Sequence, residues 1–397
     1  MDLLLLGLAA VGWLAGAALF GLTGYSFALF AYGRSLPDPP LREGRGSPAV
    51  TALVASLAAS PALGVTLRRL AEVDYPSLDV AVALGQSGSP LPAGGGPVRL
   101  LPATAAKGKA QALNAAVGEV RSPYILLLDE DSLVDPDCVR RLLPLAEDPG
   151  TWAVVGVPYA SNADAGPLQR TLDLEAEAWA SMARARDRLG LFLPATGFFS
   201  LVSRASLGAD AGVPVWDEGA LAEDADLSLR QLARGRRARL STAKVGIEAP
   251  AALGALAGQR LRWYKGMLDT LWTNRAAVAR LRPALAADGV LSLLAPLAPA
   301  GFVVLLMLSP LWPSVLLPVL LGAALVYSAS AWLSASKLGR GRAGVLLLSL
   351  PYALVQGGVA LGALGAFLLH VRVGWRRTKK SGDALQHDRL RWLSGVC

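Results

Sequence analysis

The sequence predicts an α/β domain, built on a mixed but mainly parallel sheet with helices on both faces, that is attached to transmembrane helices. Two observations support this fold class. Strand-like and helix-like segments alternate between about residues 47 and 280, and long apolar stretches flank that region. The chain of 397 residues is 53% hydrophobic, with a mean hydropathy of +0.43. That composition is too apolar for an ordinary soluble protein of this length.

The alternation within the central region is regular. We expect strands at 49–57, 78–84, 98–101 and 124–129, and helices at 66–73 and 109–120. Strands that alternate with helices form parallel sheets with helices on both faces. Ligands of such sheets bind at the carboxyl ends of the strands.

The flanking stretches predict membrane segments. A transmembrane helix needs about 20 apolar residues, so residues 3–32 hold one, 289–336 are long enough for two, and 343–371 hold one. The first stretch is expected to be an uncleaved anchor rather than a signal peptide, because Asp2 is the only charge before it. The predicted regions are an N-terminal anchor (1–33), a cytoplasmic domain (47–280), a membrane region of two to three helices (285–371) and a basic tail (372–397).

Basic residues predict the orientation. Arg34, Arg42 and Arg45 follow the first span, which places the central domain on the cytoplasmic side of a multi-pass cell-membrane protein. Four spans would then put the tail outside, although it is the most basic segment of the chain. We therefore interpret part of 289–312, which three prolines interrupt, as interfacial or re-entrant, which returns the tail to the cytoplasm.

The net charge of +8 does not predict nucleic-acid binding. Much of the excess lies beside the membrane segments, where it would face anionic lipid headgroups. The two cysteines, Cys138 and Cys397, are too few and too far apart for a disulfide framework or a metal site.

Two carboxylates at the end of strand 124–129 predict a metal site. Side chains two apart in an extended chain share a face, so Asp129 and Asp131 can converge while Glu130 turns away. Mg²⁺ or Mn²⁺ would suit these oxygen ligands, with phosphate oxygens of a substrate completing the shell. Asp135 is instead expected to cap the next helix, with Pro136 at its first position, and Asp137 to complement the dipole of that helix.

Acidic residues also stand at the predicted start of a helix later in the chain. Glu223, Asp224 and Asp226 stand at the start of a segment that ends at Gly235. Acidic residues also favour helix N-termini for purely structural reasons.

The segment "GQRLRWYKG" places Gln259, Arg262 and Trp263 on one helical face. The arginine offers a planar fork for a diphosphate, and the tryptophan a flat face for a sugar or acceptor. The alternative is a basic, aromatic helix resting on the membrane surface.

Five motifs occur in a recognisable order: "KGKAQALN" (Lys107–Asn114), "DED" (Asp129–Asp131), "PATGFFSLVSRASL", "EDADLSLR" and "QRLRW". Together with the flanking spans, they resemble the membrane-bound members of glycosyltransferase family 2, which include ceramide glucosyltransferases and cellulose and hyaluronan synthases. The resemblance covers residues 47 to 280 and implies a GT-A type sheet domain. It also implies a nucleotide-sugar donor, most simply a UDP-sugar, and a lipid acceptor in the membrane.

The resemblance also implies roles for individual residues. Asp129 and Asp131 would hold the metal on the donor diphosphate, and Asp224, beside Glu223, would be the general base of a single inverting displacement. Lys109 and Asn114 would lie near the donor, and Gly197 in the acceptor-side loop. The remaining motif residues would cradle the diphosphate and shape the acceptor entrance: Gln259, Arg262 and Trp263.

The sequence departs from the family where the nucleotide is usually recognised. The first two strands end in "VASLAASP" and "VALGQSGSP", without the usual Asn-Glu pair and Asp-Gly-Ser turn. Gly85 and Gln86 remain as donor-binding candidates, and both are neutral. Since a neutral acceptor bonds more weakly than a carboxylate, we expect weak UDP binding and poor discrimination among nucleotides.

Three functions remain open at this point. The first is the transfer of one sugar to a membrane lipid. The second is processive polysaccharide synthesis, for which three or four membrane helices look too few to form a polymer channel. The third is an inactive family member that serves as a membrane binding subunit.

Overall fold

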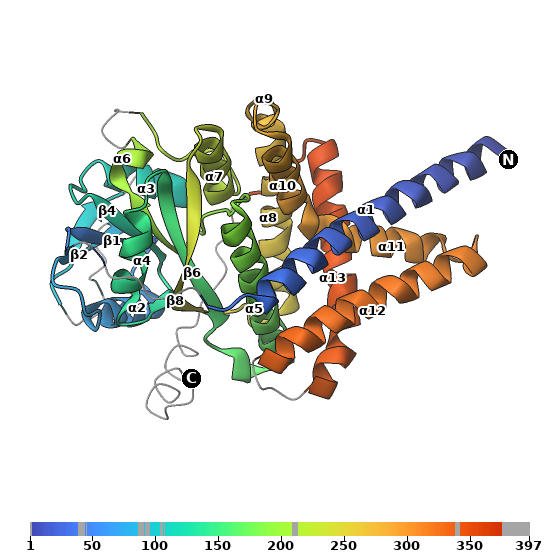
Figure 1. Cartoon of the computed structure of the whole chain (residues 1–397), viewed down its shortest axis with the longest axis horizontal. Coiled ribbons are helices and arrows are strands. Elements are labelled where there is room, and N and C mark those ends of the chain that lie inside the picture. The colour runs from blue at the N-terminus through green and yellow to red at the C-terminus, as the bar shows by residue number, and fades with distance from the viewer. Residues whose placement is uncertain are drawn as a thin grey trace.

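The computed structural model describes residues 2–38, 44, 46–85, 91, 96–103, 106, 108–208, 213–337 and 342–374. A sheet domain forms one end of the molecule, and helices α1 (Asp2–Ser35), α11 (Ala298–Leu308) and α12 (Pro313–Lys337) reach away from it (Figure 1). Between them, α8 (Leu253–Thr273), α10 (Pro283–Leu294) and α13 (Arg342–Leu368) run across that direction. Gln86 and the tail from residue 375 lie outside the described residues.

The sheet has eight strands in the order β3-β2-β1-β4-β7-β6-β8-β5. The neighbours β3, β2, β1 and β4 are parallel, as are β6 and β8, whereas β7 and β5 pair antiparallel. The mixed, mainly parallel sheet predicted from the sequence is therefore confirmed. The strands are β1 (Val50–Ser56), β2 (Leu78–Leu84), β3 (Arg99–Pro102), β4 (Tyr124–Asp129), β5 (Leu133–Val134), β6 (Thr151–Ala160), β7 (Phe199–Ser203) and β8 (Arg237–Ile247).

Apolar cores fill both faces of the sheet. Alternating side chains of β4 point to opposite sides, so Leu127 packs with Leu113 of one helix layer while Leu126 packs with Leu63 and Leu142 of the other. Helices thus cover both faces, as predicted. The helices of this domain are α2 (Pro61–Ala71), α3 (Lys109–Val117), α4 (Cys138–Ala146), α5 (Pro167–Leu189), α6 (Arg204–Leu207), α7 (Glu223–Ala233) and, near the membrane helices, α9 (Arg275–Val278).

Four helical stretches among the described residues are long and apolar enough to cross a membrane: Leu6–Ser35, Pro283–Leu308, Pro313–Ser336 and Leu348–Leu368. The second stretch is not one straight helix. A 3-10 turn at Ala295–Leu297 separates α10 from α11, within the segment that the sequence marked as broken by proline.

Two local predictions need correction. The helix expected at 66–73 begins earlier, at Pro61, because the Ser60 hydroxyl accepts a hydrogen bond from Leu63 N and caps it. Asp135 does not cap the following helix, which begins at Cys138 after Asp137. Its carboxylate instead accepts a hydrogen bond from Lys244 N at 3.0 Å.

Candidate active site

The site forms where β4 ends and α3 begins. Asp129 is the last residue of β4, and its Oδ1 lies 2.5 Å from Nζ of Lys109, the first residue of α3. Glu130 points away toward the end of β1, because its carboxylate accepts a hydrogen bond of 2.5 Å from the Ser56 hydroxyl. The sequence argument that Glu130 turns away from Asp129 is thus consistent with its contacts.

Lys109 stands at the centre of this cluster. Besides Asp129, its amine donates to the carbonyl oxygen of Gly197 at 2.8 Å and lies 4.0 Å from Oε1 of Glu223. Burial lowers the pKa of Lys109, but the carboxylates of Asp129 and Glu223 outweigh that effect and leave its pKa above the ordinary value. The amine is therefore a fixed cation among acids.

Asp224 and Glu223 open α7 and face the same cluster. Asp224 accepts hydrogen bonds from two backbone amides, Gly197 N at 3.0 Å and Ala225 N at 2.8 Å. Burial, and then the charge of Asp224, raise the pKa of Glu223 to about 7, although Lys109 opposes the shift. The two neighbouring acids thus differ: Asp224 is oriented by backbone donors, whereas Glu223 gains a proton near neutral pH.

A pocket beneath these groups brings together residues that are far apart in the sequence. It is lined by Lys109, Gly197, Glu223 and Asp224 with Trp152 and Trp216 as apolar walls. A side chain at position 197 would force the Lys109 amine to move, because an added Cβ would lie 2.7 Å from it. A glycine at this position lets its loop approach both Lys109 and Asp224.

Asp129 and Asp131 could bind a divalent cation only if a substrate supplied further oxygen ligands. Asp131 follows β4 in a turn and is 4% exposed, and its Oδ2 accepts a hydrogen bond from Glu248 N at 3.2 Å. Over the ranges that the structure describes, no three His, Cys, Asp or Glu side chains group as metal ligands. Two carboxylates and no nitrogen or sulfur ligand suit Mg²⁺ or Mn²⁺ completed by phosphate oxygens.

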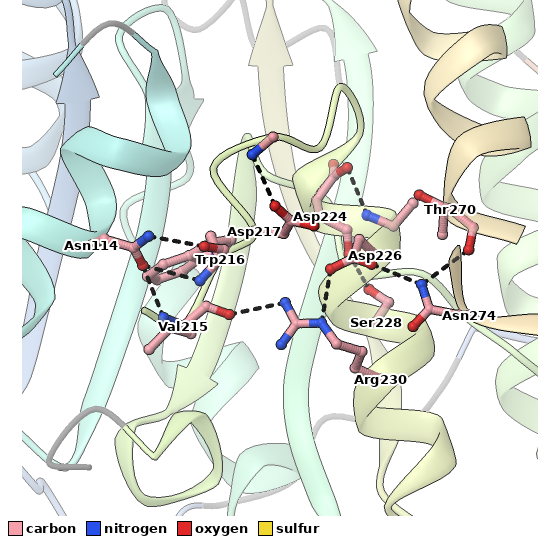
Figure 2. A network of polar contacts seen from close by, with 12 residues as sticks. Asn114, Val215, Trp216, Asp217, Asp224, Asp226, Ser228, Arg230, Thr270 and Asn274 are labelled. Carbon is pink, nitrogen blue, oxygen red and sulfur yellow. Dashed lines mark hydrogen bonds and ion pairs between the residues drawn. The ribbon is translucent and has the colours of Figure 1, made fainter. Parts of the chain in front are cut away.

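The side-chain amide of Asn114 binds a loop. Its Nδ2 donates to Trp216 O at 2.9 Å, and its Oδ1 accepts from the amides of Val215 and Trp216 (Figure 2). Nδ2 also donates to Glu218. These bonds hold the loop that places Trp216 in the pocket wall. In the structure Asn114 positions this loop, and its expected contact with the donor stays a prediction.

A second chain of polar contacts joins this loop to α7 and α8 (Figure 2). Arg230 donates to Val215 O and to Asp226 Oδ2, at 2.9 and 2.8 Å. Asp226 Oδ1 in turn accepts from Asn274, which follows α8, at 2.8 Å. Asp226 is 3% exposed, so its role here is to fix α7 against its neighbours.

Helix α8 carries the "QRLRW" motif and packs tightly against the start of α7. A Cβ added at Gly266 would lie 2.8 Å from Ala222 Cβ and 2.9 Å from its backbone nitrogen. This contact fixes α8 beside Glu223 and Asp224. Gln259, Arg262 and Trp263 are each partly buried in α8.

Sequence reasoning missed Arg260 within the same motif. Its guanidinium pairs with Glu175 of α5 at 2.9 Å and stacks 4.5 Å above the Trp263 ring. The sequence shows a second arginine inside the motif, but it does not indicate that this arginine pairs with Glu175, 85 positions earlier.

Of the two nucleotide candidates, only Gly85 is described. Its amide donates to Ser56 O at 3.0 Å, and an added Cβ would lie 3.1 Å from Leu57 Cδ1. Gly85 therefore lies where β1 and β2 end side by side.

Comparisons with known proteins agree with this architecture. A family model described as glycosyl transferase family group 2 matches residues 124–335, more than half of the chain. The poly-beta-1,6-N-acetyl-D-glucosamine synthase of Staphylococcus aureus is 30% identical over 169 residues, 42% of this chain and 40% of the synthase. The match thus spans about two fifths of that relative. An N-acetylglucosaminyltransferase of Rhizobium meliloti is 27% identical over 293 residues, 68% of each protein.

The fold has a solved counterpart. The mannosyltransferase PcManGT from Pyrobaculum calidifontis, solved in complex with GDP-Man and Mn²⁺, superposes with a TM-score of 0.62. It is 18% identical, and the superposition covers 92% of this chain and 100% of that one. The family match covers more than half of the chain, and the shared fold agrees with it. This chain therefore belongs to glycosyl transferase family group 2.

Proposed function

We propose that this protein transfers one sugar from a nucleotide-diphosphate sugar to a hydroxyl of a membrane lipid, with inversion at the anomeric carbon. The observation that carries the proposal is the convergence of Lys109, Asp129, Gly197, Glu223 and Asp224 at one edge of the sheet. A cation, a metal-binding carboxylate and an oriented base are the groups that such a displacement needs.

In this proposal Asp224 accepts the proton of the acceptor hydroxyl as that oxygen attacks the sugar. Its two backbone donors fix the direction of the carboxylate, and Gly197 keeps the approach clear of a side chain. The amine of Lys109 holds Asp129 in place and contributes positive charge near the leaving diphosphate. Arg262 of α8 is proposed to contact the same diphosphate.

Asp129 and Asp131 would hold a divalent cation. When bound, such a cation neutralises charge that develops on the departing diphosphate. One direct displacement by the acceptor inverts the anomeric centre, because no covalent sugar-enzyme intermediate intervenes.

The acceptor is proposed to be a lipid because α8, which packs against the start of α7 beside Glu223 and Asp224, adjoins the membrane segments. Helix α8 lies between α7 and the apolar helices α11 and α13, and Trp263 packs into their shared apolar cluster. An acceptor hydroxyl on a lipid headgroup could reach Asp224 from that direction.

Processive polysaccharide synthesis is a second candidate, and the relatives favour it. The Staphylococcus aureus relative is a poly-N-acetylglucosamine synthase, and the Rhizobium meliloti relative transfers N-acetylglucosamine. An N-acetylglucosamine donor is therefore the first to test with either acceptor.

One experiment separates these candidates. Purified protein is incubated with radiolabelled nucleotide sugars, beginning with UDP-N-acetylglucosamine, together with membrane lipids and Mg²⁺ or Mn²⁺. Label in an organic-extractable product that carries one sugar supports the proposal, whereas label in an insoluble polymer supports the synthase. No transfer from any donor, by a protein that still binds nucleotide, would indicate an inactive binding subunit.

A further inference from the structure

A buried carboxylate joins three separate parts of the chain. Asp288 of α10 is 3% exposed, and it is the one charged residue in the apolar sequence 283–308. Its Oδ1 accepts a hydrogen bond from the Tyr25 hydroxyl of α1 and lies 3.8 Å from Nε of Arg186, near the end of α5. Its Oδ2 accepts a hydrogen bond of 2.5 Å from the backbone nitrogen of Phe192. An ionisable residue in an apolar segment is costly, so its partners indicate what it does there.

The segment that Asp288 binds leads into the candidate active site. We call residues 190–197 the Gly197 loop. Three side chains hold its backbone amides: Asp288 holds Phe192 N, Ser228 Oγ holds Ala195 N at 2.9 Å, and Asp224 holds Gly197 N at 3.0 Å. Ser228 and Asp224 belong to α7. Helix α7 therefore holds the end of the loop that contacts Lys109, and α10 holds its beginning.

The side chain of Phe192 gives the loop a second anchor. Phe192 is 2% exposed and packs in one apolar cluster with Leu229 of α7 and Leu293 of α10. A Cβ added at Gly289 would lie 3.8 Å from Leu229, so α10 and α7 are in direct contact. This packing does not involve the carboxylate of Asp288. A substitution that removes only the carboxylate should therefore loosen the backbone of the loop without unfolding the domain.

The end of α1 supports Asp288 from the other side. Arg184 of α5 donates to the carbonyl oxygen of Gly33 at 3.4 Å, and the Arg186 guanidinium lies 5.9 Å from the centre of the Tyr25 ring. These contacts dock the last turns of α1 on α5. The docked helix places the Tyr25 hydroxyl on Asp288. A continuous series of contacts thus runs from the first apolar helix to the loop of the site.

We propose that Asp288 is a positioning residue for sugar transfer. It holds the beginning of the Gly197 loop, which keeps Gly197 in contact with Lys109 and Asp224. Tyr25 in turn orients the Asp288 carboxylate, so α1 is part of the working transferase as well as a membrane anchor. This role rests on the proposed function, because it concerns the reaction at the Gly197 loop.

Hydrogen exchange of the Gly197 loop tests the contact directly. Deuterium uptake is followed by mass spectrometry in the full-length protein in lipid nanodiscs. Asp288→Leu fills the space but accepts no hydrogen bond. Amides of residues 191–197 should then exchange roughly 10- to 100-fold faster, which is the protection that one hydrogen bond to a carboxylate provides.

Two comparisons make this result specific. Asp288→Asn should restore most of the protection, because its amide oxygen can still accept a hydrogen bond from Phe192 N. Helix α2, on the other side of the sheet domain from α10, should exchange at the wild-type rate in both variants. Wild-type exchange of residues 191–197 in Asp288→Leu would overturn the proposal.

Two tyrosines of α1 provide a matched pair. Tyr25→Phe removes one hydrogen bond from Asp288 and should speed exchange of the Gly197 loop by about 2- to 10-fold. Tyr32→Phe is the control, because Tyr32 is 39% exposed on the same helix and should leave the loop unchanged. If the two variants exchange alike, α1 does not support the loop and the proposal is overturned. The pair keeps the Asp288 carboxylate, so it decides the question even if Asp288→Leu fails to fold.

Kinetics distinguish positioning from stability. The single-turnover rate of sugar transfer should fall about tenfold or more in Asp288→Leu, because a displaced loop no longer aligns the reacting groups. Asp288→Asn should recover most of that rate. Nucleotide affinity should stay at the wild-type value, because Asp288 bonds to Tyr25 and Phe192 rather than to the proposed donor-binding residues.

Two outcomes would overturn the positioning role. One is a wild-type transfer rate in a variant whose Gly197 loop exchanges faster. The other is a loss of nucleotide affinity as large as the loss of rate, since a merely structural role would lower both. If the wild type transfers no sugar from any donor, the proposed function fails, whereas the exchange experiment still decides whether Asp288 and α1 hold the loop.

Discussion

Gly197→Ala tests whether the loop that carries Gly197 and the side chain of Lys109 act together. The added Cβ would lie 2.7 Å from Lys109 Nζ and 3.5 Å from Asp224 Oδ2. The flexible lysine is the group that must move. It would lose its 2.8 Å bond to Gly197 O and stretch its 2.5 Å contact with Asp129.

A hydrogen bond to a charged group contributes about 1.5–3 kcal/mol, so kcat/KM for sugar transfer should fall by roughly 10- to 100-fold. Transfer of labelled sugar is measured at temperatures where the variant remains folded. Gly219→Ala is the matched control, because its added Cβ would meet Asp217 at an ordinary 3.4 Å.

A double-mutant cycle shows whether the effect passes through Lys109. If it does, Gly197→Ala should cost little more once Lys109→Met has already removed the amine. Wild-type kcat/KM for Gly197→Ala, or full additivity with Lys109→Met, would refute the proposed arrangement.

Three further predictions concern the same site. Gly266→Ala should lower both activity and thermal stability, because its Cβ would lie 2.8 Å from that of Ala222. Gly258→Ala, on the open face of the same helix, should instead raise stability by about 0.5–1 kcal/mol, and equal melting temperatures for the two variants would contradict this. The pKa of Glu223 is raised to about 7, so the folded protein favours its neutral form. The wild type should therefore lose on the order of 3 kcal/mol of folding stability relative to Glu223→Gln as the pH rises from about 4.5 to 7. A stability difference in thermal melts that does not depend on pH would refute this cause. EDTA should abolish sugar transfer by the wild type, and Mg²⁺ or Mn²⁺ should restore it, whereas neither ion should restore transfer by Asp131→Ala. If Asp131→Ala is active in the presence of EDTA, Asp131 is not a metal ligand.

The fold was largely predictable because its signals are local. The apolar run of β4 and the Gly235 stop of α7 are each visible within a few residues. The last four strands, β5 to β8, were not predicted, because their pairing depends on partners far along the chain.

The convergence of the site could not be derived from spacing. Lys109, Gly197 and Asp224 lie in three separate segments, and only the family resemblance placed them together before the structure did. The ion pair of Arg260 with Glu175 could not be predicted either, because the residues around Arg260 in the sequence do not indicate its partner.

The membrane region contains a residue pattern that its average composition does not reveal. By length and apolarity α13 looks like a crossing helix. Its buried polar residues, Ser349, Tyr352 and Gln356, recur at intervals of three and four and were the available signal for a docked face. Composition averages over that pattern and therefore hides it.

The most direct test of the central claim, that Asp224 is the base of a glycosyl transfer at this site, is the single-turnover rate of Asp224→Asn. The amide keeps the shape of the side chain but cannot take the acceptor proton. The account predicts a fall in rate of about 10² or more with nearly unchanged donor binding, while Asp217→Asn, a nearby exposed acid that also accepts a backbone hydrogen bond, stays close to wild type. A loss confined to donor binding, or equal rates for the two variants, would contradict it.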